Sequence, residues 1–221
     1  AQADLPYRAP TMADLAAAQV PAWAVQAITD AGRRMDARNW VPATAGNLSV
    51  RLDDGDIAIT RSGCHKGHLD RDGIMLVDLD GQPITSGARP SAETGLHLQI
   101  YRAFPGAGAV LHGHSIAATV LSLRPGDRIT LAGYELLKAF DGQRTHDAAV
   151  DVPVFDNDQD ISRLAAAIAP HLPTCHAAYA IRGHGVYAWG PDMDTALVRL
   201  EALEFLLACE LAREHERGRH P

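Results

Sequence analysis

The sequence predicts one α/β domain with three layers, in which helices cover both faces of a mixed, largely antiparallel central sheet. Three observations lead to this fold class. Apolar segments of strand length alternate with amphipathic segments of helical period, and turn signals such as Asp-Gly and Pro-Gly separate them. Strands are joined by tight turns as often as by helices, which favours a mixed sheet over a doubly wound parallel one. A chain of 221 residues with 47% hydrophobic content can bury one sizeable core.

We expect the domain to span residues 1–221, with residues 1–10 and the charged end, 214–221, as its candidate flexible parts. Apolar residues at helical spacing predict two helices between residues 11 and 38, because Pro21 interrupts the pattern or starts a second segment. The chain therefore begins with helical structure before its first strands.

The next segment predicts three strands and a helix. Residues 48–52 and 57–60 flank an Asp-Asp-Gly turn and form a β-hairpin, and residues 74–79 form a third strand that ends at Asp-Gly. Ser91 opens a helix through its Ser-Ala-Glu-Thr sequence, and the apolar face of this helix stops before Pro105-Gly106.

A strand that ends in a histidine pair follows at residues 109–114, and Ser115 can cap the next helix. The remaining predicted elements are a strand at 129–131, a one- or two-turn helix at 134–140, a strand at 150–155, a helix at 160–171, paired strands at 178–181 and 186–189, and a long leucine-rich helix at 192–216.

Charge and cysteine content exclude several classes of function. The formal net charge is -7, and the sequence contains no cluster of Lys and Arg residues that could bind a phosphodiester backbone, so we expect no nucleic acid partner. The cysteines are odd in number and lack Cys-x-x-Cys spacing, which argues against a disulfide framework and favours a reducing cytoplasm. No stretch approaches roughly eighteen consecutive apolar residues, and no basic-then-apolar leader opens the chain. We therefore expect a cytoplasmic protein that does not contact a membrane.

Three histidines form the most informative pattern of the chain. His112 and His114 are two residues apart at the end of an apolar strand, so their imidazoles point to the same face and can share one cation. His184 lies between two glycines in the turn of the later strand pair. Zinc suits imidazole, and three protein ligands with an open fourth position are typical of a catalytic site. The alternative is a strand edge whose histidines simply face water.

Two glycine-containing loops, Gly46–Ser49 and Thr60–Gly63, lie at strand ends and combine backbone N–H groups with short hydroxyl or amide side chains. Such loops can bind a phosphate, although the same residue types are also ordinary turn material. Ser91 and Lys66 lie in neighbouring predicted loops. Together with a metal site, these loops point to a small phosphorylated substrate.

Two carboxylates flank the histidine pair in sequence. Glu93 opens the helix before the histidine strand, and Glu135 opens the short helix after it. Either side chain can serve as a general acid or base, which enolate chemistry requires. The alternative for both is a structural role, because glutamate in a first helical turn complements the helix dipole.

Taken in order along the chain, these motifs resemble the class II aldolase and adducin family, over roughly residues 20 to 210. The matching motifs are Gly46-Asn47-Leu48-Ser49, Thr60-Arg61-Ser62-Gly63, Ser91-Ala92-Glu93, His112-Gly113-His114-Ser115 and Arg182-Gly183-His184-Gly185.

The resemblance implies one zinc ion per subunit and a phosphate pocket, and it implies a homotetramer with active sites near subunit contacts. The implied zinc ligands are His112, His114 and His184. The implied substrate-binding and phosphate-binding residues are Asn47, Thr60, Ser62, Gly63, Lys66 and Ser91. The family's aldolases use a glutamate at the position of Glu93, whereas its dehydratases use one at the position of Glu135. This chain has both, and we expect Glu135 to act with support from Glu93.

Within the family, three segments are most similar to the branch that dehydrates a methylthio-substituted ketose phosphate in methionine salvage. These segments are Ser62–Gly67, Gly133–Lys138 and His184–Gly190. The implied reaction removes a proton next to the carbonyl and expels the neighbouring hydroxyl as water. An aldolase or epimerase acting on a fuculose-type or ribulose-type phosphate is the nearest alternative. A non-catalytic adducin-like scaffold is a further alternative, but it should lack the metal ligands.

Overall fold

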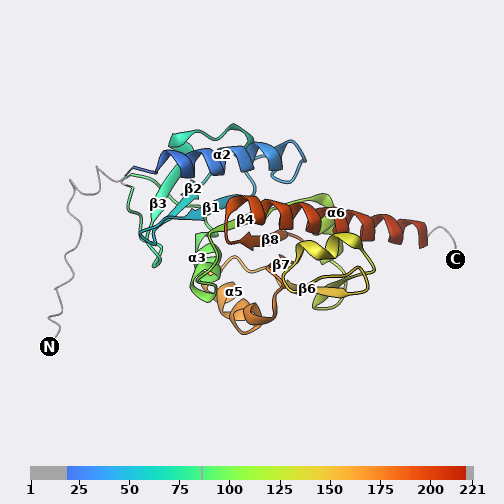
Figure 1. The fold of residues 1–221 in the computed structure, drawn as a ribbon. Coiled ribbons are helices and arrows are strands. Elements are labelled where there is room, and N and C mark those ends of the chain that lie inside the picture. The colour runs from blue at the N-terminus through green and yellow to red at the C-terminus, as the bar shows by residue number, and fades with distance from the viewer. Residues whose placement is uncertain (1–18, 86, 218–221) are drawn as a thin grey trace, which may run out of the picture.

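The computed structural model describes residues 19–85 and 87–217, and its centre is one eight-stranded sheet (Figure 1). The strands are β1 (Asn47–Arg51), β2 (Ile57–Thr60), β3 (Ile74–Val77), β4 (Ala109–Gly113), β5 (Arg128–Ala132), β6 (Ala149–Phe155), β7 (Ala178–Ile181) and β8 (Gly185–Gly190). Their order in the sheet is β3-β2-β1-β4-β8-β7-β6-β5. Every neighbouring pair is antiparallel except β6 and β7, which are parallel. The predicted mixed, largely antiparallel sheet is therefore confirmed.

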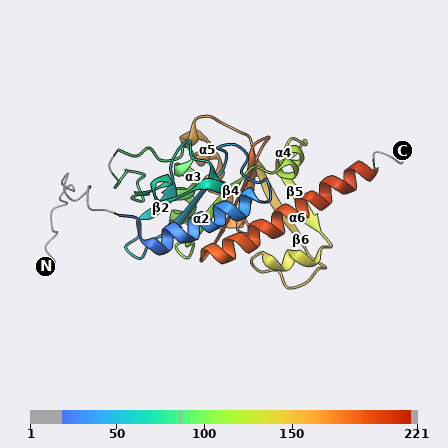
Figure 2. The same cartoon turned by 90° about the horizontal axis from the view of Figure 1, so that it is seen from above.

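Helices cover both faces of this sheet. The helices are α2 (Ala22–Asp36), α3 (Thr94–Ala103), α4 (Ile116–Ser122), α5 (Ile161–Ile168) and α6 (Met193–Arg217). Figures 1 and 2 show α2 and α6 side by side over one face, whereas α3 and α5 lie against the other. The molecule thus has the predicted three layers.

The period of two along each strand divides the core between the faces. On β4, Leu111 packs with the residues of α2, α4 and α6, whereas its neighbour Val110 packs with those of α3 and α5. Both side chains are fully buried. A strand with helices on both faces has no polar face, and this explains why β4 reads as a continuous apolar run before its histidines.

Helix starts differ in how they are capped, and one difference bears on function. Ser115 caps α4 by accepting a hydrogen bond from the Ala118 N–H at 3.0 Å. Glu93 occupies the corresponding position before α3, but its side chain makes no capping hydrogen bond. The turn that precedes α3 is closed instead by Thr94, whose N–H and hydroxyl both donate to the Ser91 carbonyl. The Glu93 carboxylate is therefore free to point elsewhere.

Most predicted elements are present with boundaries within three residues, and two predicted helices are shorter than expected. The segment 134–140 is a 3-10 helix at Glu135–Ala139. The helix predicted at 160–171 ends at Ile168 and continues as a 3-10 turn through Thr174, because Pro170 and Pro173 lack the N–H that an α-helix requires. The helix expected from residue 11 and residues 1–10 lie outside the described residues. Of the charged end, 214–221, residues 214–217 belong to α6, and 218–221 lie outside the described residues.

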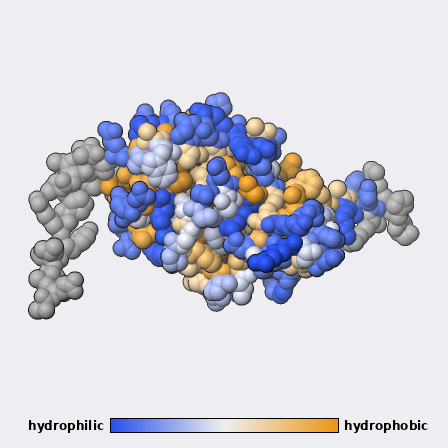
Figure 3. Space-filling model, in the orientation of Figure 1, coloured by the Kyte–Doolittle hydropathy of each residue, from blue (hydrophilic) through white to orange (hydrophobic). Residues whose placement is uncertain are grey.

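The face shown in Figure 3 is mostly hydrophilic and carries separate apolar patches. Within residues 19–85 and 87–217, no helix combines the length and the apolar character needed to cross a bilayer.

Candidate metal centre and active-site cavity

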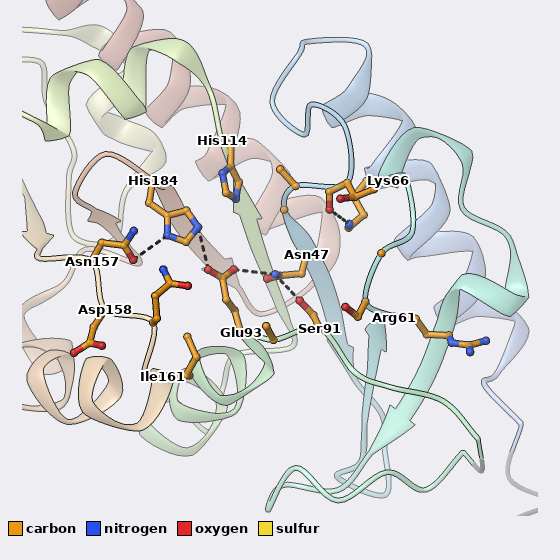
Figure 4. A pocket seen from close by; sticks show the side chains of 17 residues that line it. Asn47, Arg61, Lys66, Ser91, Glu93, His114, Asn157, Asp158, Ile161 and His184 are labelled. Carbon is orange, nitrogen blue, oxygen red and sulfur yellow. Dashed lines mark hydrogen bonds and ion pairs between the residues drawn. The ribbon is translucent and has the colours of Figure 1, made fainter.

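The structure brings the three predicted histidines together around the Glu93 carboxylate. His112 lies on β4, His114 follows its end, and His184 lies in the turn between β7 and β8. One ligand atom from each histidine and one Glu93 oxygen all lie within 4.8 Å of one another. The ring centroids are 4.5 to 5.1 Å apart. Figure 4 shows His114, His184 and Glu93 converging on one point. Four donors of these types can hold a divalent cation.

The neighbours of His112 fix which of its nitrogens faces the cluster. Its Nδ1 lies 2.9 Å from the Val186 carbonyl oxygen, so Nδ1 carries the hydrogen and donates it. Tyr187 stacks on the ring at 4.1 Å between centroids, which sets the plane of the imidazole. In the neutral ring Nε2 then presents a lone pair. This atom is buried and has no hydrogen-bond partner in the described part of the chain, although Glu93 Oε2 is 3.1 Å away.

His184 presents its Nε2 in the same way. Its Nδ1 lies 3.4 Å from the side-chain oxygen of Asn157, and its Nε2 lies 3.0 Å from Glu93 Oε1. Two imidazole lone pairs directed at one carboxylate repel unless a positive charge lies between them. A divalent cation supplies that charge, and imidazoles oriented by a second hydrogen bond are typical of metal ligands. The donor set therefore fits a metal ion.

Burial and charge set the protonation of this cluster. Burial raises the pKa of Glu93, but the neighbouring His112 and His184 outweigh burial and hold the pKa of this carboxyl well below its usual range. Burial, reinforced by the neighbouring His112 and His184, lowers the pKa of His114 to about 3. His114 is consequently neutral near pH 7, as an imidazole must be to bind a metal.

Two glycines allow the chain segments around the histidines to approach closely. Gly46 adopts φ +76°, and a Cβ at this position would lie 2.7 Å from the His112 carbonyl oxygen. A Cβ at Gly185 would lie 2.1 Å from the Gly113 carbonyl oxygen. Side chains at these positions would push β1 and β8 away from β4. Glycine is thus required for the histidines to converge.

A cavity of about 370 Å³ lies beside the cluster (Figure 4). Eight of the residues predicted from the sequence line it, namely Asn47, Ser62, Gly63, Lys66, Ser91, Glu93, His114 and His184. His112 is completely buried behind them and contacts Glu93. Polar groups from five separate segments of the chain therefore face one cavity, as in small-molecule sites.

Lys66 is a buried cation on this cavity wall. Its Nζ donates to the carbonyl oxygens of Thr44 and Cys64, each at 2.6 Å. Burial lowers the pKa of Lys66, and the nearby Cys64 and Glu93 act in the opposite direction. An ammonium group has three N–H donors, so one remains for a ligand.

Thr60 and Glu135 lie outside the cavity. Thr60 is fully buried, and its hydroxyl accepts a hydrogen bond from the Leu48 N–H at 3.3 Å. Glu135 is 69% exposed and pairs with Lys138, which holds the pKa of its carboxyl below the usual value. Within the described part of one chain, Glu135 does not meet the three histidines.

The cavity also includes residues that sequence reasoning did not single out, chiefly Thr44, Asn157, Asp158, Gln159 and Ile161. The last four follow β6, where a polar run precedes α5. Polar residues at the end of a strand are a usable signal, but this run also reads as an ordinary helix start. Only the position of β6 beside β7 brings the run to His184.

A second group of metal-binding side chains lies elsewhere. Asp36, His65 and His68 have ligand atoms within 4.8 Å of one another. His65 already accepts a hydrogen bond from the Gly67 N–H through Nδ1, and His68 is exposed. This group has one donor fewer than the Glu93 cluster and lies outside the residues that line the cavity.

Comparison with known proteins agrees with this geometry. Residues 26–211 match the class II aldolase and adducin N-terminal domain. The chain is 64% identical over 193 residues to a methylthioribulose-1-phosphate dehydratase from Gluconacetobacter diazotrophicus, covering 87% of this chain and 94% of the relative. It is 54% identical to the enzyme of the same name from Pseudomonas paraeruginosa, covering 84% and 92%. An L-fuculose-1-phosphate aldolase structure from Thermus thermophilus superposes with a TM-score of 0.71 at 28% identity, covering 91% and 99%. The chain therefore belongs to the class II aldolase and adducin N-terminal domain family.

Proposed function

We propose that this protein is a zinc-dependent hydro-lyase that dehydrates 5-methylthioribulose 1-phosphate to 2,3-diketo-5-methylthiopentyl 1-phosphate in methionine salvage. The observation that carries the proposal is the convergence of three imidazoles and one carboxylate beside a polar cavity. The relatives that are 53% to 64% identical over most of the chain bear the name of this activity, which supports the choice of reaction.

Zinc suits the donor set of the cluster. His112, His114 and His184 would hold the ion through nitrogen, and Glu93 lies within reach as a fourth donor. When bound, the ion would supply a Lewis acid that polarises a ketone and its adjacent hydroxyl. Nε2 of His112 is buried and has no hydrogen-bond partner among the described residues, which supports this assignment, because an orphaned buried acceptor is costly without a ligand.

The opposite wall of the cavity suits a phosphate. Lys66 offers its remaining N–H, and Asn47, Ser62, Gly63 and Ser91 add polar groups around the same space. A dianionic phosphate would also stabilise the buried positive charge of the Lys66 ammonium group. Thr60 would act only indirectly, by holding β1 through its hydrogen bond to Leu48.

The reaction needs one carboxylate to accept a proton from carbon 3 and one acid to protonate the hydroxyl that leaves carbon 4. Loss of this water gives an enol, and transfer of its hydroxyl proton to carbon 4 gives the diketone. Glu93 is the carboxylate nearest the histidines, which supports it as the group that accepts the carbon 3 proton. Glu135 remains our candidate for the second role.

Glu135 could reach a substrate only in an assembly, because its side chain faces solvent in the single chain. We therefore include a cytoplasmic homotetramer in the proposal, in which Glu135 acts at the site of a neighbouring copy. The exposed apolar side chains Leu136, Val198 and Phe205 line a second cavity, and Leu136 is the neighbour of Glu135 in sequence, which supports contact between copies there.

A substrate comparison tests the function directly. Purified protein would be incubated with 5-methylthioribulose 1-phosphate, L-fuculose 1-phosphate and L-ribulose 5-phosphate, each with and without a chelator, and followed by zinc add-back. We expect diketone from the first substrate alone, its loss with chelator and its return with zinc. Triose phosphate formation without diketone would instead identify an aldolase, and interconverted pentulose phosphates would identify an epimerase.

A further inference from the structure

A line of buried polar side chains runs from Glu93 into the core between β1 and α3. Asn47 Nδ2 lies 3.0 Å from Glu93 Oε2, and His97 Nε2 hydrogen-bonds to the opposite atom of the same amide, Asn47 Oδ1. His97 Nδ1 then lies 2.7 Å from Ser49 Oγ, which lies 2.8 Å from the Tyr101 hydroxyl. All four side chains behind Glu93 are at most 3% exposed.

Only one direction of hydrogen donation is compatible with a carboxylate at the start of this line. A carboxylate accepts, so the Asn47 amide must donate to it, and its second N–H donates to Ser91 Oγ at 2.9 Å. The carbonyl end of Asn47 must then accept from His97, which places the His97 hydrogen on Nε2. Consequently Nδ1 accepts from Ser49, and Ser49 accepts from Tyr101.

The Asn47 amide joins the two halves of the cavity, as Figure 4 shows by its dashed lines to Glu93 and Ser91. One N–H contacts the carboxylate of the histidine cluster, and the other contacts a hydroxyl on the proposed phosphate side. Rotation of this amide by 180° would turn its oxygen toward Glu93, where like partial charges repel. A group that prevents rotation of the Asn47 amide therefore maintains both hydrogen bonds, the one to Glu93 and the one to Ser91.

We propose that His97 is a positioning residue, whose Nε2–H holds the Asn47 amide in the orientation that donates to Glu93 and Ser91. The role in catalysis rests on the function proposed above, whereas the tautomer of His97 does not. Two features support the proposal. His97 is completely buried, and it hydrogen-bonds to Asn47, which lines the cavity. Burial, reinforced by the neighbouring His112, lowers the pKa of His97 to about 3. A neutral ring has one donor and one acceptor, so it can enforce one direction.

Nitrogen-15 NMR of histidine-labelled wild-type protein tests the tautomer without any substrate. We expect the His97 ring to be neutral with its hydrogen on Nε2, both before and after zinc is added. The spectra would be recorded between about pH 6 and pH 8, because a free histidine changes its protonation over roughly this range. The His97→Gln spectrum assigns the resonance by its disappearance. A hydrogen on Nδ1, or a doubly protonated ring, would overturn the proposal even if the enzyme were fully active.

Substitutions of His97 test whether the orientation of the Asn47 amide affects catalysis. Gln can place an amide N–H near the position of Nε2, whereas Phe fills the space without a donor. We expect His97→Phe to lower kcat about 10–100-fold and to raise KM, with His97→Gln recovering most of both losses. His146→Phe, an exposed histidine on a loop, is the matched control.

Equal losses in the Gln and Phe variants, with unchanged thermal unfolding, would show that the donated hydrogen is irrelevant and would refute the positioning role. If the wild-type protein lacks dehydratase activity, the proposed function fails, and the NMR experiment alone decides the orientation of Asn47.

Discussion

The Nε2 atom of His112 lies 3.1 Å from Oε2 of Glu93, yet it has no hydrogen-bond partner in the described part of the chain. Its other nitrogen is committed to the Val186 carbonyl, so the ring cannot rotate to satisfy Nε2 without losing that bond. A buried acceptor that faces a carboxylate is unfavourable in an isolated protein and favourable around a cation.

Replacing His184 with Ala should abolish stoichiometric zinc binding, because the remaining imidazoles and Glu93 leave one side of the ion open. We expect zinc retention after dialysis, measured by atomic absorption, to fall to a small fraction of the wild-type value. His68→Ala, in the second metal-capable group, serves as the control and should keep its zinc. Equal zinc in wild type and His184→Ala would exclude His184 as a ligand.

Glu93→Gln should lower kcat by about 10²–10⁴-fold, since an amide cannot accept the proton from carbon 3. The substitution keeps the shape of the side chain, so KM for the substrate should change far less. Steady-state kinetics of zinc-loaded protein provide the measurement. A kcat within a few-fold of wild type would remove Glu93 from the proton transfer.

Variants at Glu135 and at His184 should complement each other when they assemble together. Glu135→Gln and His184→Ala are each expected to be inactive alone. Co-refolding the two variants should restore a measurable fraction of activity, because a site with intact histidines then meets an intact Glu135 from its neighbour. No recovery in a mixed assembly verified by mass spectrometry would show that Glu135 does not act between copies.

Lys66→Met should weaken phosphate binding and destabilise the fold. The Thr44 and Cys64 carbonyl oxygens would lose their donor inside the protein, which costs about 1–3 kcal/mol in the free energy of unfolding. Urea unfolding measures this loss, and KM measures the weaker binding. Lys138→Met, at an exposed position, should leave the free energy of unfolding nearly unchanged. Equal stability of the two variants would contradict a structural role for the Lys66 hydrogen bonds.

Glu204 should make the stability of the protein fall as pH rises. Burial raises the pKa of this α6 carboxyl to about 7, and the nearby Ser115 hydroxyl offsets only part of the rise. Because the folded state binds this proton more tightly than the unfolded state, the contribution of Glu204 is fully present below about pH 4.5 and is lost progressively up to about pH 7.

Glu204→Gln removes this titration. Its free energy of unfolding, relative to wild type, should rise by roughly 1–3 kcal/mol between pH 5 and pH 8. Urea unfolding at intervals across this range provides the measurement. A stability difference between the two proteins that does not change with pH would show that Glu204 titrates normally.

Local patterns were sufficient for the parts of the fold and site that depend on neighbours in sequence. The period of two placed His112 and His114 on one face, and the leucine spacing predicted α6 almost to the residue. The position of Glu93 was predictable as a helix start. It was not predictable that the Glu93 side chain would leave the cap unbonded, because Thr94 closes the turn in its place.

What the sequence could not provide depends on contacts between distant segments. The Asn157 side chain reaches His184 only because β6 pairs in parallel with β7, a pairing that no local pattern encodes. Likewise, His97 reads as one buried residue on the apolar face of a helix. Its link to Asn47 arises because α3 packs across β1, fifty residues away in the chain.

The most direct test of the account is a crystal structure of zinc-loaded protein with anomalous diffraction data collected at the zinc edge. We predict one strong anomalous peak per chain, about 2.0–2.1 Å from Nε2 of His112 and His184 and from a ring nitrogen of His114. A peak at Asp36, His65 and His68 instead, or no peak beside Glu93 in protein that contains zinc, would contradict a zinc site formed by His112, His114 and His184.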